Sequence, residues 1–180
     1  MAVDGFKGLE LEGVELKAGE NVGDRYYQKQ VEGGGGRNAL FEESPVFQSL
    51  KLASLSAFSS TYLQFFNSPI TPSEASAVFC WATVGGNSAL FHPPHTHKNS
   101  RLSAVYYPTF PEGSSPLTLM DKRGGMENSF DVLPEPGEMV VFPSWVQHYV
   151  APCETEEWRV SWSCNLPGEW EDTADMNLEL

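Results

Sequence analysis

The amino-acid sequence predicts an all-β fold with one or two helices ahead of the strands, arranged as a jelly roll (double-stranded β-helix). The first observation is a series of short runs rich in β-branched and aromatic residues between Ala77 and Cys164. The second is the turn content, since the chain has 16 Gly and 13 Pro and several stand between these runs. The third is the length of 180 residues, which fits one domain with a sizeable core. Many short strands at close spacing are typical of a jelly roll.

Seven runs have strand character. They alternate between apolar and polar residues or are short and apolar, and turn residues such as Gly85-Gly86 and Pro134-Glu-Pro-Gly137 separate them. We expect strands over residues 77–84, 102–107, 117–120, 130–133, 138–142, 147–150 and 158–164.

One helix is expected before the strands, over residues 45–67. Its apolar residues recur near a period of 3.6, Ser44 is a candidate N-cap, and Pro45 suits the first helical position. We therefore expect this helix to pack on the outside of a sheet.

The chain is interpreted as a single domain over residues 1–180. Residues 1–75 form an N-terminal cover that contains the helix, residues 76–166 form the β core, and residues 167–180 form an acidic tail. The segment Gly33-Gly-Gly-Gly36 predicts a turn or loop inside the cover.

The charge of the chain excludes some classes of partner. Eleven Lys and Arg against 24 Asp and Glu give a net charge of −13, which repels nucleic-acid backbones and anionic membranes. The N-terminus lacks a basic segment followed by an apolar run, and no window approaches 18 consecutive apolar residues. We expect a cytoplasmic protein that binds neither nucleic acid nor a membrane.

The three cysteines, Cys80, Cys153 and Cys164, are far apart in the sequence and odd in number. Neither a disulfide framework nor a C-x-x-C zinc or redox site is indicated by this spacing. Buried free thiols are the expected state, because free cysteine behaves as a small hydrophobic residue.

The histidines are the strongest chemical signal. Three of the four, His92, His95 and His97, fall within six residues. Side chains at positions i and i+2 of a strand leave the same face, so His95 and His97 can bind one metal through neutral imidazoles. His148 lies in another predicted strand and is the expected third ligand. We predict one metal ion held by these three side chains at about 2.0–2.2 Å.

The run 158–164 alternates strictly. Arg159, Ser161 and Ser163 share one face. The other face, which we expect to be core, carries Trp158, Val160, Trp162 and Cys164. An arginine that faces inward needs an anionic partner, and a ligand carboxylate held by a guanidinium and a hydroxyl would suit it. The same alternation also fits an arginine that faces solvent, and the sequence leaves both readings open.

These motifs, in this order, resemble those of the Fe(II)- and 2-oxoglutarate-dependent oxygenase superfamily. The resemblance covers roughly residues 81–165 and is carried by His95-Thr-His97, Asn99-Ser-Arg-Leu-Ser-Ala-Val-Tyr-Tyr107, Pro136-Gly-Glu-Met-Val-Val-Phe-Pro-Ser-Trp145, His148 and Arg159-Val-Ser161.

The resemblance implies a cupin-like fold and roles for individual residues. It makes His95 and His148 metal ligands, and Arg159 with Ser161 the pair that grips the distal carboxylate of 2-oxoglutarate. Tyr107 matches a tyrosine that hydrogen-bonds that carboxylate in similar prolyl hydroxylases.

The chain departs from the superfamily at the third ligand. The superfamily completes a two-histidine, one-carboxylate triad, whereas His97 stands two residues after His95. The third ligand is therefore His97, as in three-histidine cupin dioxygenases, or Asn99 in a second register. His92 is as well explained by a supporting position beside the site as by metal binding.

The predicted function is that of a dioxygenase, most simply a hydroxylase, which uses Fe(II) and 2-oxoglutarate on an unidentified small-molecule or peptide substrate. One alternative is a three-histidine cupin-type dioxygenase or isomerase that works without 2-oxoglutarate. Another is a jelly roll that binds a metal or ligand without catalysis, because a fold does not fix a function.

Overall fold

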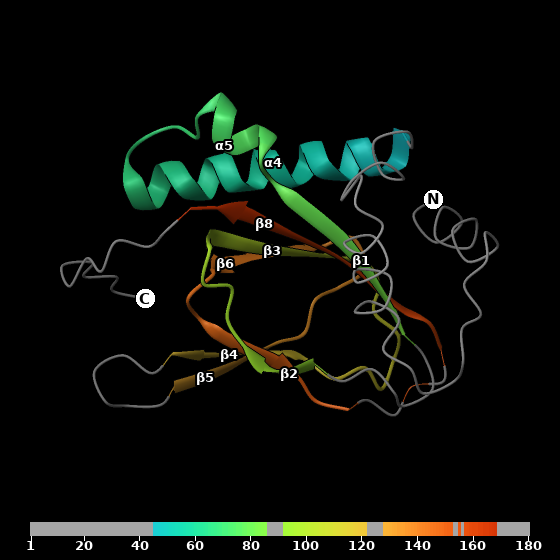
Figure 1. The fold of residues 1–180 in the computed structure, drawn as a ribbon. Coiled ribbons are helices and arrows are strands. Elements are labelled where there is room, and N and C mark those ends of the chain that lie inside the picture. Colours follow the sequence, from blue (N-terminus) through green and yellow to red (C-terminus); the bar gives the residue numbers. More distant parts are fainter. Residues whose placement is uncertain (1–44, 86–91, 122–127, 153–154, 156, 169–180) are drawn as a thin grey trace, which may run out of the picture.

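The computed structural model describes residues 45–85, 92–121, 128–152, 155 and 157–168. In this part of the chain two helices precede eight strands (Figure 1). The elements are α4 (Pro45–Phe66), α5 (Pro72–Ser76), β1 (Phe79–Gly85), β2 (His92–His95), β3 (Ser100–Thr109), β4 (Leu117–Asp121), β5 (Asn128–Val132), β6 (Met139–Pro143), β7 (Gln147–Val150) and β8 (Arg159–Pro167).

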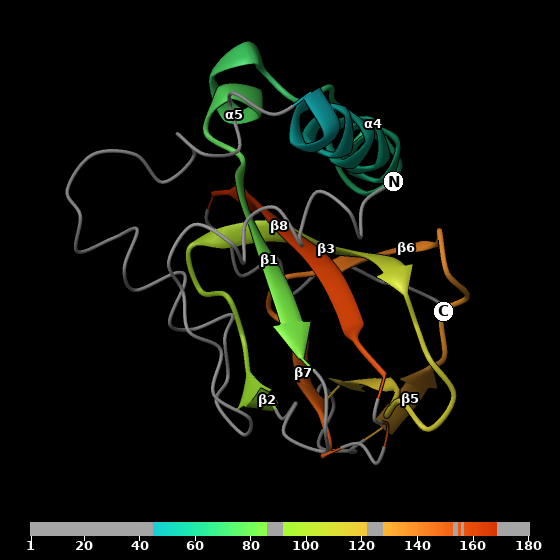
Figure 2. The same ribbon diagram turned by 90° about the vertical axis from the view of Figure 1, so that its right-hand side faces the viewer.

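The strands form two four-stranded sheets, and within each sheet all neighbouring strands are antiparallel. Sheet A has the order β1-β8-β3-β6 and sheet B the order β2-β7-β4-β5. Sheet A lies between the helices and sheet B, as the two perpendicular views show (Figures 1 and 2). The predicted jelly roll is confirmed, and all seven predicted strands are present, six of them with shifted ends and the run 147–150 as predicted.

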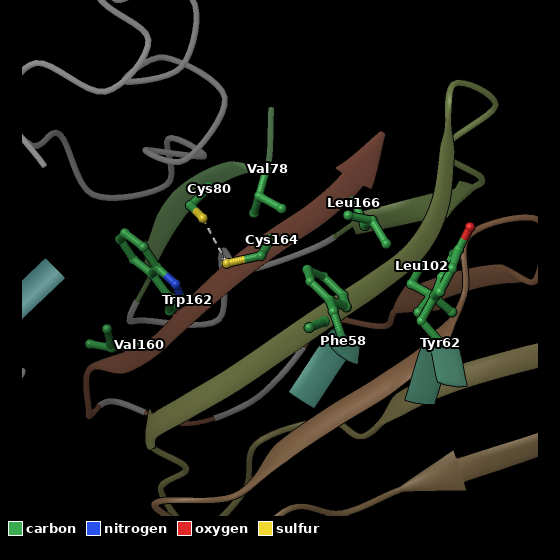
Figure 3. Close-up of a cluster of buried hydrophobic side chains, with 10 residues drawn as sticks. Phe58, Tyr62, Val78, Cys80, Leu102, Val160, Trp162, Cys164 and Leu166 are labelled. Atoms are coloured by element: carbon green, nitrogen blue, oxygen red, sulfur yellow. Dashed lines mark hydrogen bonds between the residues drawn. The ribbon is translucent and has the colours of Figure 1, made fainter. Parts of the chain in front are cut away.

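Helix α4 covers the outer face of sheet A, as predicted. Phe58 and Tyr62 are 0% and 4% exposed and pack with Leu102, Trp162 and other residues of the sheet (Figure 3). The predicted N-cap Ser44 and the rest of the cover before Pro45 lie outside the described residues. No helix in the described part of the chain combines the length and the apolar character needed to span a membrane.

The sequence allowed a second helix but did not locate it, and one strand was not among the seven predicted runs. Helix α5 begins with a capping box, in which the Thr71 hydroxyl accepts the Glu74 backbone N–H and the Glu74 carboxylate accepts the Thr71 N–H. The sequence Thr71-Pro-Ser-Glu74 has the spacing of a capping box and could have predicted the start of this helix. Strand β2 was missed because Pro93 and Pro94 read as a break. Both prolines are tolerated because β2 is an edge strand of sheet B.

Strand β8 shows the predicted alternation, with one correction. Val160, Trp162 and Cys164 are buried against the outer core, while Arg159 and Ser161 face the space between the sheets. Trp158, expected on the core face, is 49% exposed because β8 begins only at Arg159.

Cys80 and Cys164 are free and buried, as expected. They are opposite one another on β1 and β8, with their Sγ atoms 2.9 Å apart beneath α4 (Figure 3). Their hydrogen bond and their burial raise the pKa of the Cys80 thiol. Strand pairing brings together two residues that the sequence separates by 84 positions, whereas Cys153 lies outside the described residues.

Candidate active site

A cavity of about 440 Å³ lies between the two sheets. Side chains of both sheets and of the segment after β2 line it. All eight residues that the sequence singled out for the site are among them: His92, His95, His97, Asn99, Tyr107, His148, Arg159 and Ser161.

His95, His97 and His148 form a group that can hold a metal ion, with one ring nitrogen of each within 4.8 Å of the others. Strand pairing explains two of the three, because His95 on edge strand β2 is directly opposite His148 on β7. Their ring centroids are 4.2 Å apart, and the His97 ring lies 5.1 Å from each of them. The group contains no carboxylate.

His97 reaches the group by a route that the sequence did not predict. Strand β2 ends at His95, so the expectation that His95 and His97 share a strand is wrong. The backbone N–H of His97 instead donates to the carbonyl of Ser144, 3.0 Å away, in the turn between β6 and β7. This bond joins the segment after β2 to the start of the strand that carries His148.

Backbone carbonyls orient two of the rings. Nδ1 of His95 lies 2.7 Å from the carbonyl of Pro93, and Nδ1 of His148 lies 3.0 Å from the carbonyl of Val146. Because a carbonyl only accepts, each Nδ1 carries the proton and donates. Nε2 of both rings is then left with a free lone pair, which is the form that binds a metal.

Burial also keeps the imidazoles neutral. It lowers the pKa of His97 to about 4, with a smaller contribution from His95. Burial lowers the pKa of His148 to about 3, against an opposing effect of its bond to Val146. Without a metal, both side chains are neutral at neutral pH and are ready to coordinate.

Asn99, the alternative third ligand, lies in an exposed turn at the rim of the cavity. Its backbone carbonyl accepts the N–H of Gly168, 3.1 Å away. The geometry therefore favours His97 over Asn99 as the third donor.

Arg159 is buried at another part of the cavity wall. It is 2% exposed, so the reading in which it faces solvent is excluded. Its guanidinium carbon lies 5.7 Å from the centroid of Tyr107 and 5.2 Å from that of Phe110. Burial raises the pKa of Tyr107 to about 12 although Arg159 acts in the opposite direction, so the phenol keeps its proton.

Sequence reasoning missed the aromatic residues that β1 contributes. Phe79 and Trp81 line the cavity with ring centroids 5.3 Å apart, and the Trp81 centroid lies 5.9 Å from that of His97. The alternation of Phe79, Trp81 and Thr83 with smaller residues in β1 was the signal that could have identified this face. Phe110 follows β3 in a segment that gives no such signal.

Comparison with known proteins agrees with this site. A family model described as a putative 2OG-Fe(II) oxygenase matches residues 79–165. No curated protein matches the chain.

Solved structures with a similar fold include three enzymes. A prolyl-4-hydroxylase from Pseudomonas putida aligns with a TM-score of 0.50 and 20% identity, over 71% of this chain and 67% of its own. A prolyl 4-hydroxylase from Phytophthora capsici aligns with a TM-score of 0.53 and 16% identity, over 81% and 52%. A 2OG-Fe(II) oxygenase family oxidoreductase from Burkholderia pseudomallei aligns with a TM-score of 0.50 and 14% identity, over 69% and 61%. This chain therefore spans about half to two thirds of their lengths.

The matched residues 79–165 contain the histidine group, Tyr107, Arg159 and Ser161. The resemblance read from the sequence is confirmed, and with it the enzyme class and the two cofactors, Fe(II) and 2-oxoglutarate, at the level of the family. Residues 79–165 of this chain therefore match the family of putative 2OG-Fe(II) oxygenases.

Proposed function

We propose that this domain binds one ferrous ion on His95, His97 and His148 and acts as a 2-oxoglutarate-dependent oxygenase, most simply a hydroxylase. Arg159, Ser161 and Tyr107 are proposed to hold the distal carboxylate of 2-oxoglutarate. The observation that carries the proposal is a buried arginine in the same cavity as three clustered imidazoles.

A buried guanidinium is costly unless an anion or its equivalent accompanies it. Ser161 lies two residues after Arg159 on the same face of β8, and Tyr107 lies next to the guanidinium. A carboxylate bound here would receive a bidentate contact from Arg159 and hydrogen bonds from the two hydroxyls. The Tyr107 hydroxyl keeps its proton at neutral pH, so it is a donor.

Three neutral ligands fit a ferrous ion and change how the site works. A carboxylate ligand would cancel part of the charge of the metal, whereas imidazoles leave it whole. We expect weaker retention of Fe(II) than in a site with a carboxylate. We also expect a stronger attraction between the loaded site and the two negative charges of 2-oxoglutarate.

Bound iron, with 2-oxoglutarate and oxygen, supplies the oxidising chemistry of the family. The residues of this chain position the reactants and limit the access of water. His95 and His148 direct Nε2 into the cavity, Arg159 fixes the far end of the co-substrate, and the aromatic side chains of Phe79 and Trp81 form an apolar wall beside His97.

The alternatives explain less of the cavity. A three-histidine dioxygenase or isomerase without 2-oxoglutarate uses the same metal group but gives Arg159 and Ser161, which line the same cavity, no function. A jelly roll that only binds a ligand agrees with the geometry and differs in turnover, because it forms no succinate from 2-oxoglutarate.

Metal content tests the histidine group. His95→Ala and His148→Ala should each remove most of the bound metal from protein loaded anaerobically with Fe(II), because two imidazoles hold a ferrous ion poorly. His92→Ala is the matched control, since His92 lines the same cavity but is not in the group. Elemental analysis after gel filtration measures the outcome. Equal metal content in His148→Ala and the wild type would show that the site is misassigned.

A further inference from the structure

We infer that a single turn, residues 143–146, positions two of the three metal ligands, and that a buried chain of hydrogen bonds through Ser144, Ser103 and Asn165 fixes this turn to sheet A. The inference rests on the proposed metal site and assigns Ser144 and Ser103 as positioning residues. They belong to motifs that carried the family resemblance and that the proposed chemistry does not use.

The turn connects β6 to β7 and touches both ligands. It is closed by the Val146 N–H, which donates to the carbonyl of Pro143 at 3.0 Å. The carbonyl of Ser144 accepts the backbone N–H of His97 at 3.0 Å. The carbonyl of Val146 lies 3.0 Å from Nδ1 of His148. A shift of the turn would therefore move the backbone of His97 and rotate the ring of His148.

Ser144 attaches the turn to β3 through its backbone N–H, which donates to the carbonyl of Arg101 at 3.0 Å, and through its side chain. Its hydroxyl oxygen lies 2.8 Å from that of Ser103 on β3, and the Ser103 hydroxyl donates to Oδ1 of Asn165 on β8, also at 2.8 Å. Ser103 has one hydroxyl proton and gives it to Asn165, so Ser144 must be the donor to Ser103. The chain therefore runs in one direction, from the turn through β3 to β8.

The opposite orientation of the amide is less favourable. If the Asn165 nitrogen faced Ser103, the Ser103 proton would go to Ser144, and the buried Ser144 proton would lose its acceptor in this chain. In the orientation present, both hydroxyl protons are used.

Burial shows that the hydroxyl chain is a fixed part of the wall. Ser144, Ser103 and Asn165 are 0%, 2% and 7% exposed. Apolar side chains of similar size would give comparable stability, because a buried neutral hydrogen bond contributes little net free energy. Directed hydrogen bonds add a defined position, and here the position they define is that of the turn beneath His97 and His148.

The expected consequence is a loss of metal affinity in the folded protein. Changes to groups that orient metal ligands typically weaken binding by about 10- to 100-fold. Ser144→Ala and Ser103→Ala should each weaken Mn(II) binding, measured by calorimetry, by about tenfold or more. Co(II)-loaded variants should also show an altered d–d absorption spectrum, because the ligand geometry changes.

Ser54→Ala is the matched control. Ser54 is also 0% exposed and hydrogen-bonded, to the carbonyl of Leu50 and to Cys164, but it lies on α4 beyond the outer face of sheet A. It should leave Mn(II) affinity within about twofold of the wild type even if it lowers the thermal midpoint of the metal-free protein. If Ser144→Ala does not fold, Ser103→Ala, which leaves the turn sequence intact, decides the matter.

The outcomes separate this inference from the function on which it rests. Wild-type protein that binds no Mn(II), Co(II) or Fe(II) contradicts the proposed metal site itself. Wild-type protein that binds the metal, with Ser103→Ala and any folded Ser144→Ala equal to Ser54→Ala in affinity and spectrum, leaves that site intact and overturns the positioning role.

Discussion

For Arg159, the sequence predicted which residues share its face of the strand but not whether that face is buried. The alternation in β8 placed Arg159 and Ser161 on one face, but a solvent-facing arginine fitted the same pattern. Its burial to 2% exposure comes from strands β1 and β3 on either side of β8, which no local pattern reveals.

Replacement of Arg159 tests its proposed partner. Arg159→Ala should cost about 2–5 kcal/mol of 2-oxoglutarate binding, or about 30-fold to several thousand-fold in affinity, because a desolvated ionic contact is lost. Ser161→Ala and Tyr107→Phe should cost about 1.5–3 kcal/mol each. Anaerobic calorimetry on metal-loaded protein measures this. Arg101→Ala is the control, since Arg101 pairs with Glu74 away from the cavity. Unchanged affinity in Arg159→Ala would remove it from the site.

The buried histidines predict how the metal-free protein responds to acid. Their pKa values are lowered to about 4 for His97 and about 3 for His148, against about 6.5 in an unfolded chain. Between these values the unfolded chain binds more protons, so stability is fully present above about pH 6.5 and falls as the pH falls towards 4. Thermal midpoints measured from pH 7.5 to pH 5 should decline less steeply in His148→Gln than in the wild type. Equal slopes would argue against a buried neutral His148.

At the scale of elements, the sequence predicted the strands with a regular alternation better than the edge strand β2 and the short helix α5. The seven runs appeared because their period of two is intrinsic to a half-buried strand. Strand β2 was hidden by Pro93-Pro94, which weaken any strand signal although an edge strand tolerates them. Helix α5 spans only Pro72–Ser76, which is too short for a helical period to show in the sequence. Its signal was the capping box instead.

Helix α4 makes a prediction of its own. Phe58→Ala should lower the free energy of unfolding by about 3–5 kcal/mol, because the ring is 0% exposed in the core between α4 and sheet A. Leu63→Ala on the same helix should change it by less than about 0.5 kcal/mol, since Leu63 is 54% exposed. Urea unfolding followed by circular dichroism compares the two. Similar costs for both would mean that α4 does not dock through Phe58.

At the scale of the whole molecule, the site arises where two sheets face each other. His148 and His95 come from sheet B, Arg159 and Tyr107 from sheet A, and His97 from the segment after β2. The sequence identified these residues by type and order. It could not predict the contact between His97 and Ser144, because that contact depends on how the turn that leads from sheet A to sheet B meets the end of an edge strand.

The central claim is that the histidine group and Arg159 together form one site for iron and 2-oxoglutarate. The most direct measurement is the titration of 2-oxoglutarate into anaerobic, Fe(II)-loaded wild-type protein, followed by the visible charge-transfer absorbance of the chelate. The account predicts a saturable band that requires iron, is competed by succinate and is lost in His148→Ala. Absence of saturable binding at millimolar 2-oxoglutarate, in protein shown to contain iron, would contradict the account and favour a three-histidine site that works without this co-substrate.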